Sequence, residues 1–312
     1  MLTDDAEIPV IDRASLDRVI TFANGKGGVG KTTLSANVGG LAAADDARVL
    51  VVDLNGQGNL SLDLGIRETD VDDDGEALAD AVLQGAALRP AREVRPRLDV
   101  CVGGSAIGQL PALLASRYQL QPEVQALQLA ASLQQVAGDY DLVVIDSPPE
   151  NPPLQQLALA ATRWLVVPVS SDRAAIRDGL GKIARQFALV RKRVNPSLDL
   201  LGVVLFGSGS SSRAIRREVR RDVSAVLGDE HAMFHTVIRH SEAVAKQARD
   251  RGLLVHELEQ QAANNPAFWK LRTGEADRSQ MVTATSASVA EDLADLTREV
   301  FGRIAELEGA EA

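Results

Sequence analysis

Residues Ala23–Thr33 read "ANGKGGVGKTT" and stand between a run of β-branched residues and a helical pattern. Within them, Gly25–Thr32 fit the pattern G-x-x-x-x-G-K-[ST] of a phosphate-binding loop, in the strand–loop–helix context which that pattern requires. The glycines let backbone N–H groups surround an anion, and the following helix turns its positive dipole end to the same charge. In such a loop Lys31 reaches the β- and γ-phosphates, and the Thr32 hydroxyl ligates Mg²⁺. The stretch therefore predicts a nucleoside triphosphate site.

The loop also contains a second lysine, Lys26, at its entrance. A single phosphate cradle needs one lysine, and Lys31 already supplies it. We expect the Lys26 side chain to point away from its own cradle, at the outer rim of the loop. A cation at that position is well placed to reach a phosphate held by another subunit.

The apolar runs of the chain predict the fold around this loop. They are continuous rather than alternating, which indicates strands buried on both faces, and helical patterns separate them. The order predicts an α/β fold of the P-loop NTPase type, with one doubly wound, mostly parallel sheet and helices on both of its faces. The expected strands are Arg18–Ala23, Arg48–Asp53, Leu98–Val102, Asp141–Asp146, Trp164–Val169 and Leu200–Phe206, and the expected helices include Lys31–Ala44, Pro122–Ala137, Ile176–Val194 and Arg213–Leu227.

The sequence predicts one domain, residues 18–312, preceded by an extension of 17 residues. That extension is too short for an upstream helix-turn-helix domain, so site-specific repression through such a domain is not expected. Residues 260–288 are polar and form an excursion before a last helix at Val289–Leu307. A surface loop explains the excursion, and a contact made by Phe268 and Trp269 with a partner is the alternative.

Composition limits the class of protein. The N-terminus lacks an apolar stretch typical of a signal peptide, and no window approaches the roughly 18 apolar residues of a membrane span. Cys101 is the single cysteine, so it is expected to be a buried thiol and cannot hold an iron–sulfur cluster within one chain. These features predict a cytoplasmic protein that makes no membrane contact.

The net charge of −10 hides an asymmetry along the chain. Residues 172–251 contain 16 Lys/Arg and 9 Asp/Glu, a local charge of +7, so the remainder carries −17. Five arginines of Arg213–Leu227 fall on one helical face, opposite an aliphatic stripe. Guanidinium groups in such an array suit a phosphate backbone, although a solvated helix face is the alternative. The DNA-binding residues predicted on this basis are Arg213, Arg216, Arg217, Arg220 and Arg221, with Lys246 and Arg249 as an extension.

Residues 26–33, "KGGVGKTT", resemble the K-G-G-x-G-K-T-T signature of the ParA/MinD family of deviant Walker A ATPases at every position. In that family the signature lysine crosses a two-fold interface to the partner's ATP, so the resemblance implies an ATP-dependent homodimer joined through Lys26. Within the family, the chain most resembles small ParA-type partition ATPases without an N-terminal helix-turn-helix domain. A MinD-like membrane switch is disfavoured because the chain ends in an acidic tail, which is unsuited to anionic lipid.

The resemblance extends over most of the chain. "RVLVVDLNGQGNLS" (Arg48–Ser61), "YDLVVIDSPP" (Tyr140–Pro149) and "TVIRHSEAVAKQARDRGLLVHEL" (Thr236–Leu258) resemble the family's second motif, its Walker B strand and its segment near the adenine. It implies a magnesium shell of Thr32, Asp53 and Asp146. It also implies nucleotide contacts from Gly27, Gly28, Val29, Gly30, Lys31, Thr32, Thr33, Phe206, Ile238 and Arg239.

One position departs from the family's pattern. The second motif usually reads D-x-D-P-Q, and here it reads Asp53-Leu54-Asn55-Gly56-Gln57. Asn55 therefore occupies the place of the carboxylate that positions or activates the attacking water. An amide still orients water but accepts no proton, so slow hydrolysis, or hydrolysis that depends on a partner, is expected. The alternative is that Asn55 is a harmless variation. The catalytic set that the resemblance implies is Lys26, Lys31 and Asn55.

The sequence as a whole thus predicts a partition ATPase that uses ATP and Mg²⁺. It is expected to dimerise with ATP, to bind DNA non-specifically on the nucleoid, and to position a plasmid or chromosome with a ParB-type partner. The alternative is an ATP-gated scaffold that barely hydrolyses and positions a protein cargo.

Overall fold

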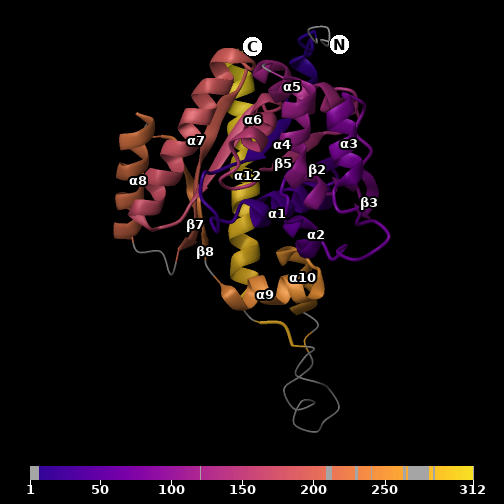
Figure 1. The fold of residues 1–312 in the computed structure, drawn as a ribbon. Coiled ribbons are helices and arrows are strands. Elements are labelled where there is room, and N and C mark those ends of the chain that lie inside the picture. Colours follow the sequence, from indigo (N-terminus) through magenta and orange to yellow (C-terminus); the bar gives the residue numbers. More distant parts are fainter. Residues whose placement is uncertain are drawn as a thin grey trace.

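The computed structural model describes residues 7–119, 121–208, 213–228, 231–239, 241–262, 265, 281–283 and 285–311. Within them lies one eight-stranded sheet with the order β3-β4-β2-β5-β1-β6-β7-β8 (Figure 1). All neighbouring strands are parallel except β3 and β4, which are antiparallel. The strands are β1 Val19–Phe22, β2 Val49–Asp53, β3 Ala91–Arg95, β4 Leu98–Cys101, β5 Leu142–Asp146, β6 Trp164–Val169, β7 Asp199–Ser208 and β8 Met233–Arg239.

Helices cover both faces of the sheet (Figure 1). One face of the sheet packs with α1, α2, α9, α10 and α12, and the other face packs with α3 to α8. The helices are α1 Lys31–Ala44, α2 Asn59–Asp63, α3 Glu76–Gln84, α4 Ser105–Arg117, α5 Pro122–Leu133, α6 Pro152–Ala160, α7 Arg173–Arg193, α8 Arg213–Leu227, α9 Glu242–Arg251, α10 Val255–Ala262 and α12 Ser286–Glu311. The expected doubly wound fold is therefore confirmed.

Local signals explain several helix ends near the site. The Asn151 side chain accepts a hydrogen bond from the Leu154 N–H at the start of α6, which prolines also open. Ser241 accepts from the Val244 N–H in the same way at the start of α9. These caps satisfy N–H groups that a helix start leaves unpaired, and so they fix where the two helices begin.

The central strands are buried on both faces, as their apolar runs predicted. Residues of β1, β2 and β5 are all buried, and Trp164 at the start of β6 is among the largest fully buried side chains. Cys101 at the end of β4 is also buried, and burial raises the pKa of its thiol above the ordinary value.

Among the helices of the described residues, none combines the length and the apolar character that a membrane span requires.

The structure extends the predicted elements at the two ends of the chain. Arg13 of the N-terminal extension donates hydrogen bonds to the carbonyl oxygens of Ala160 (2.5 Å) and Val194 (2.6 Å), so this segment packs against the domain. α10 continues to Ala262 and α12 begins at Ser286, so these two helices reach into both ends of the range 260–288. Phe268 and Trp269 lie outside the described residues.

Candidate nucleotide-binding site

The phosphate loop connects β1 to α1 at the carboxyl edge of the parallel strands. Gly30 has a φ of 85°, a left-handed conformation that favours glycine, and α1 begins directly after it. A Cβ atom at Gly30 would lie 2.6 Å from the ring of Phe206 in β7, so this ring packs directly against the loop. The Asn24 side chain holds the loop's entrance, accepting from the Lys26 N–H (3.0 Å) and donating to the Pro168 carbonyl (2.6 Å).

Lys31 points back into its own loop. Its Nζ donates to the Lys26 carbonyl oxygen at 2.8 Å, and the residue is buried. Burial lowers the pKa of Lys31 to about 8, although the carboxylates of Asp146 and Glu150 oppose this shift. The ammonium therefore lies where the loop would surround a phosphate. A bound anion there would stabilise the charged form of Lys31.

Asp53 and Asp146 form the acidic part of the site. They end β2 and β5, they are register partners, and both are fully buried. Asp146 Oδ2 accepts from the Thr32 hydroxyl at 2.6 Å, and Asp53 Oδ1 accepts from the Asn55 N–H at 2.8 Å. The remaining oxygens, Asp53 Oδ2 and Asp146 Oδ1, are buried without a hydrogen-bond partner.

Burial makes the charged forms of the two carboxylates unfavourable. Burial, together with the neighbouring Asp146, raises the pKa of Asp53 well above its ordinary value. Burial raises the pKa of Asp146 to about 7, and the hydrogen bond from Thr32 and the charge of Lys31 oppose that rise. Buried carboxylates with unpartnered oxygens fit a cation, and Mg²⁺ typically takes one or two carboxylates with further ligands from substrate phosphates. The Thr32, Asp53 and Asp146 set therefore fits the expected magnesium shell.

Asn55 lies beside this acidic pair. The residue is buried, and its Oδ1 accepts from the Gln57 N–H at 3.1 Å. The side chain thus stabilises the turn that leads into α2, and it brings no negative charge toward the phosphate loop.

A pocket of about 200 Å³ opens beside the loop and contains the residues expected near the adenine. Gly28, Gly30, Thr33, Phe206, Ile238 and Arg239 all line it. The Arg239 guanidinium is held by Asp292 of α12 in a two-pronged ion pair of 2.8 Å. The other lining residues lie on or next to α9, α10 and α12. Five of them belong to the stretch Thr236–Leu258 that was expected near the adenine, although none was named as a nucleotide contact: Ser241, Val244, Ala245, Arg249 and Val255. Val289 and Leu293 of α12 lie outside that stretch, and sequence reasoning did not identify them.

Lys26 lies on the rim of the loop, as its position predicted. Its side chain is 41% exposed, and its Nζ lies 3.6 Å from the Asp172 carboxylate in the segment between β6 and α7. An exposed pair of this kind contributes about 0–1 kcal/mol, so it leaves Lys26 available to another anion.

The basic helix predicted at Arg213–Leu227 is α8, at the left margin of Figure 1 beside α7. Val219 and Val223 are buried against α7, while Arg216, Arg217 and Arg221 are exposed and Arg220 is half-buried. Asp222 is buried and pairs with Arg177 at 3.1 Å, which links α8 to α7. The arginine face is therefore turned outward; the Arg213 side chain lies outside the described residues.

Two of the expected DNA contacts lie elsewhere. Lys246 and Arg249 belong to α9, which packs on the opposite face of the sheet from α8. Arg249 Nε donates to Asp63 of α2 at 2.8 Å and lines the pocket beside the phosphate loop. The sheet separates the two helices, so Lys246 and Arg249 do not extend the arginine face of α8, and a contact of theirs with DNA stays a prediction.

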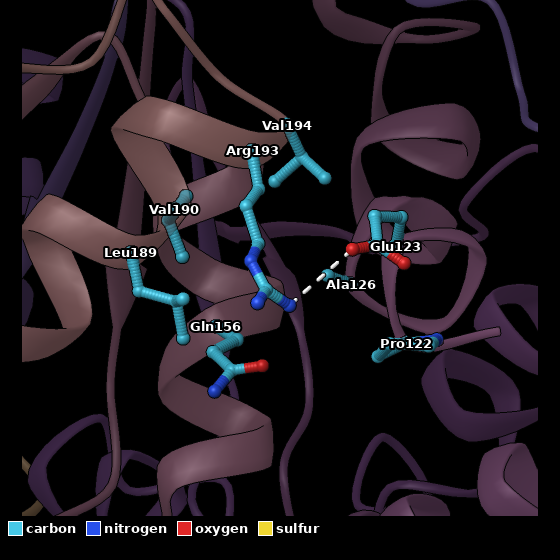
Figure 2. Close-up of a pocket in the computed structure, with 8 residues that line it drawn as sticks. All are labelled: Pro122, Glu123, Ala126, Gln156, Leu189, Val190, Arg193 and Val194. Carbon is cyan, nitrogen blue, oxygen red and sulfur yellow. Dashed lines mark hydrogen bonds and ion pairs between the residues drawn. The ribbon is translucent and has the colours of Figure 1, made fainter. Parts of the chain in front are cut away.

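A second, smaller groove lies between α5, α6 and α7 (Figure 2). Its walls are mostly aliphatic, and an ion pair of 3.4 Å between Arg193 and Glu123 crosses it. It contains no residue of the phosphate loop or of the acidic pair.

The phosphate loop, its two lysines and the buried acidic pair define the class of protein: a P-loop NTPase with a second lysine at the rim of its loop.

Comparisons with known proteins identify the family. The AAA domain family matches residues 17–200. The chain is 32% identical over 263 residues to the chromosome partitioning protein ParA of Caulobacter vibrioides, covering 81% of this chain and 92% of that protein. It is 34% identical over 229 residues to the chromosome-partitioning ATPase Soj of Thermus thermophilus, covering 73% and 84%. The chain belongs to the ParA family of P-loop ATPases.

Solved structures share the fold. The ATP complex of a Cyanothece McdA variant aligns with a TM-score of 0.67 and 20% identity, over 91% of this chain and 96% of that one. Cobyrinic acid a,c-diamide synthase from Mycobacterium smegmatis, with a bound ATP analog and magnesium, aligns with a TM-score of 0.56 and 29% identity, over 67% and 79%.

Proposed function

We propose that this chain is a partition ATPase that binds ATP and Mg²⁺, dimerises with ATP, and positions plasmid or chromosome cargo with a ParB-type partner. The observation that carries the proposal is the pairing of two lysines in one loop with two buried carboxylates that each keep an unpartnered oxygen. The similar proteins named for chromosome partitioning support the cargo.

At the phosphate loop, the chain's own groups bind and orient the nucleotide. Lys31 releases the Lys26 carbonyl and holds the β- and γ-phosphate oxygens, while the loop's N–H groups surround them. Thr32, Asp53 and Asp146 would hold Mg²⁺, which would supply positive charge to the phosphate oxygens. Phe206 and Ile238 form the apolar wall for the base, beside the Arg239–Asp292 pair.

Lys26 links nucleotide binding to dimerisation. Its ammonium leaves Asp172 and reaches the phosphates bound by the partner subunit, so ATP becomes part of the interface. A dimer duplicates the arginine face of α8, and two such faces bind duplex DNA more tightly than one. Association with the nucleoid follows from this non-specific binding, and release requires hydrolysis of ATP to ADP and phosphate.

A weakly hydrolysing, ATP-gated scaffold for a protein cargo is the second candidate, and Asn55 is the observation that favours it. The two are separated by measuring phosphate release from Mg–ATP alone, with duplex DNA, and with a ParB-type centromere-binding protein. A partition ATPase is stimulated by DNA and that protein together. A rate that neither component changes contradicts it and supports the scaffold.

A further inference from the structure

Glu150 stands at the mouth of the nucleotide site in a strained backbone conformation. Its φ is 51°, which is uncommon for a residue other than glycine and costs about 1 kcal/mol or more. The segment before it is fixed: Gln155 Nε2 donates to the Pro148 carbonyl at 3.1 Å, and the Pro149 ring lies next to Gly27 of the phosphate loop. The fold thus holds Glu150 beside the loop, four residues after Asp146.

Glu150 lies beside the entrance of the phosphate loop. Its carboxylate is 3.8 Å from the Lys182 Nζ, and the Lys182 Cβ lies 2.5 Å from the place of a Cβ atom at Gly25, where the loop begins. Asp146 is fully buried and bound to Thr32. Glu150 is therefore a carboxylate beside the loop that the proposed magnesium shell does not use.

The Glu150 side chain is held only weakly. Its partner is Lys182 of α7 at 3.8 Å, and the Glu150 side chain is 68% exposed. Lys182 has a shorter contact with Asp178, at 2.8 Å. Since exposed pairs contribute about 0–1 kcal/mol, rotating Glu150 toward the loop loses little free energy.

We propose that Glu150 is the catalytic carboxylate of this chain and replaces the one that Asn55 lacks. It orients the attacking water and accepts one of its protons. The water oxygen forms a bond to the γ-phosphorus, and the bond from that phosphorus to the β–γ bridging oxygen breaks. The products are ADP and inorganic phosphate, and Glu150 returns its proton to solvent. This inference rests on the proposed ATPase activity.

The test is a double-substitution cycle on the full-length protein with Mg–ATP and DNA. Glu150→Gln keeps shape and removes the proton acceptor, and we expect kcat to fall about tenfold or more, equal to roughly 1.4 kcal/mol of barrier. With Asn55→Asp already present, the same change should lower kcat less than about threefold, because two groups that share one role are not additive. Glu123→Gln is the control, a half-buried glutamate paired with Arg193 at 3.4 Å in the groove of Figure 2, and it should leave kcat unchanged.

A second readout does not depend on turnover being measured. After free ATP is removed, the ATP-induced dimer of the Glu150→Gln variant should persist about tenfold longer by light scattering, while ATP affinity stays within about twofold. If Glu150→Gln lowers kcat equally with and without Asn55→Asp, or does not lower it at all, the proposed role of Glu150 is wrong and the proposed ATPase activity stands. A wild-type chain that binds ATP and never releases phosphate would overturn the ATPase proposal together with it.

Discussion

Asn55 is neutral at the position where the D-x-D-P-Q motif that this stretch resembles has its second aspartate, yet the geometry here suits a carboxylate. Its Oδ1 accepts a hydrogen bond from the Gln57 N–H, and a carboxylate oxygen accepts the same bond. An aspartate at this position therefore fits the turn without rearranging it, and adds one negative charge beside the phosphate loop.

We predict that Asn55→Asp raises the ATPase rate, by up to about tenfold, since roughly 1.4 kcal/mol of barrier is within reach of one catalytic group. Steady-state phosphate release with and without DNA measures it. The Asn55→Ala variant is the control and should not be faster than wild type. An aspartate variant no faster than wild type under either condition would show that this position does not limit hydrolysis.

The parts of the site that a local motif encodes could be predicted from sequence. Lys31, Thr32 and Asp146 each stand at a strand end or in the loop itself, so their meeting follows from a parallel sheet. Arg249 could not be placed in this way, because its partner Asp63 lies 186 residues away and a helical arginine pattern carries no information about which face of the sheet it covers.

At the scale of elements, buried strands were predictable and edge strands were not. The six expected strands are all present, because β-branched runs buried on both faces stand out from their flanks. β8 has a mixed burial pattern, and β3 contains charged residues and has no fully buried position. An edge strand is hydrogen-bonded to one neighbouring strand only and often carries charged residues, so its sequence resembles that of a loop.

The turn after α9 makes a backbone contact that fixes the wall of the nucleotide pocket. Gly252 ends α9 with a φ of 61°, and a Cβ atom there would overlap the Cα of Gly65, just after α2. Together with the Arg249–Asp63 ion pair, this contact ties α9 to the segment that begins at Asn55. A side chain at Gly252 must therefore push apart two backbones.

We predict that Gly252→Ala lowers the free energy of unfolding by about 2–4 kcal/mol, from the left-handed backbone and the overlap together. Denaturant titration measures it. Gly138→Ala is the control, since nothing lies within 4 Å of a Cβ there, and it should change stability by less than about 0.5 kcal/mol. If both variants unfold at the same denaturant concentration, α9 is not packed against this segment as described.

At the scale of the molecule, the charge is segregated. The chain carries −10 overall, yet α8 turns an arginine face outward at one margin of the molecule (Figure 1). A lone face on an acidic protein binds a polyanion poorly at physiological salt. Two faces in a dimer bind better, so ATP would control DNA binding through dimerisation.

We predict that DNA binding is independent of base sequence, strengthened by ATP and steeply weakened by salt, because each phosphate neutralised contributes about 0.9 to the log–log slope. Arg217→Glu with Arg220→Glu should abolish binding in a fluorescence anisotropy titration and leave ATP-dependent dimerisation intact. Arg193→Glu, at the groove between α5, α6 and α7, is the control and should bind normally. Unchanged binding by the doubly substituted chain would place the DNA contact outside α8.

The ATP-dependent change of mass is the most direct test, because the second lysine of the loop is the feature on which the account depends. In multi-angle light scattering we expect the 33.2 kDa chain to be a monomer without nucleotide and about twice that mass with Mg–ATP. Lys26→Ala should bind ATP and remain monomeric, since its loop keeps Lys31. A mass that is the same with and without ATP, or a Lys26→Ala variant that dimerises as wild type does, would contradict the account.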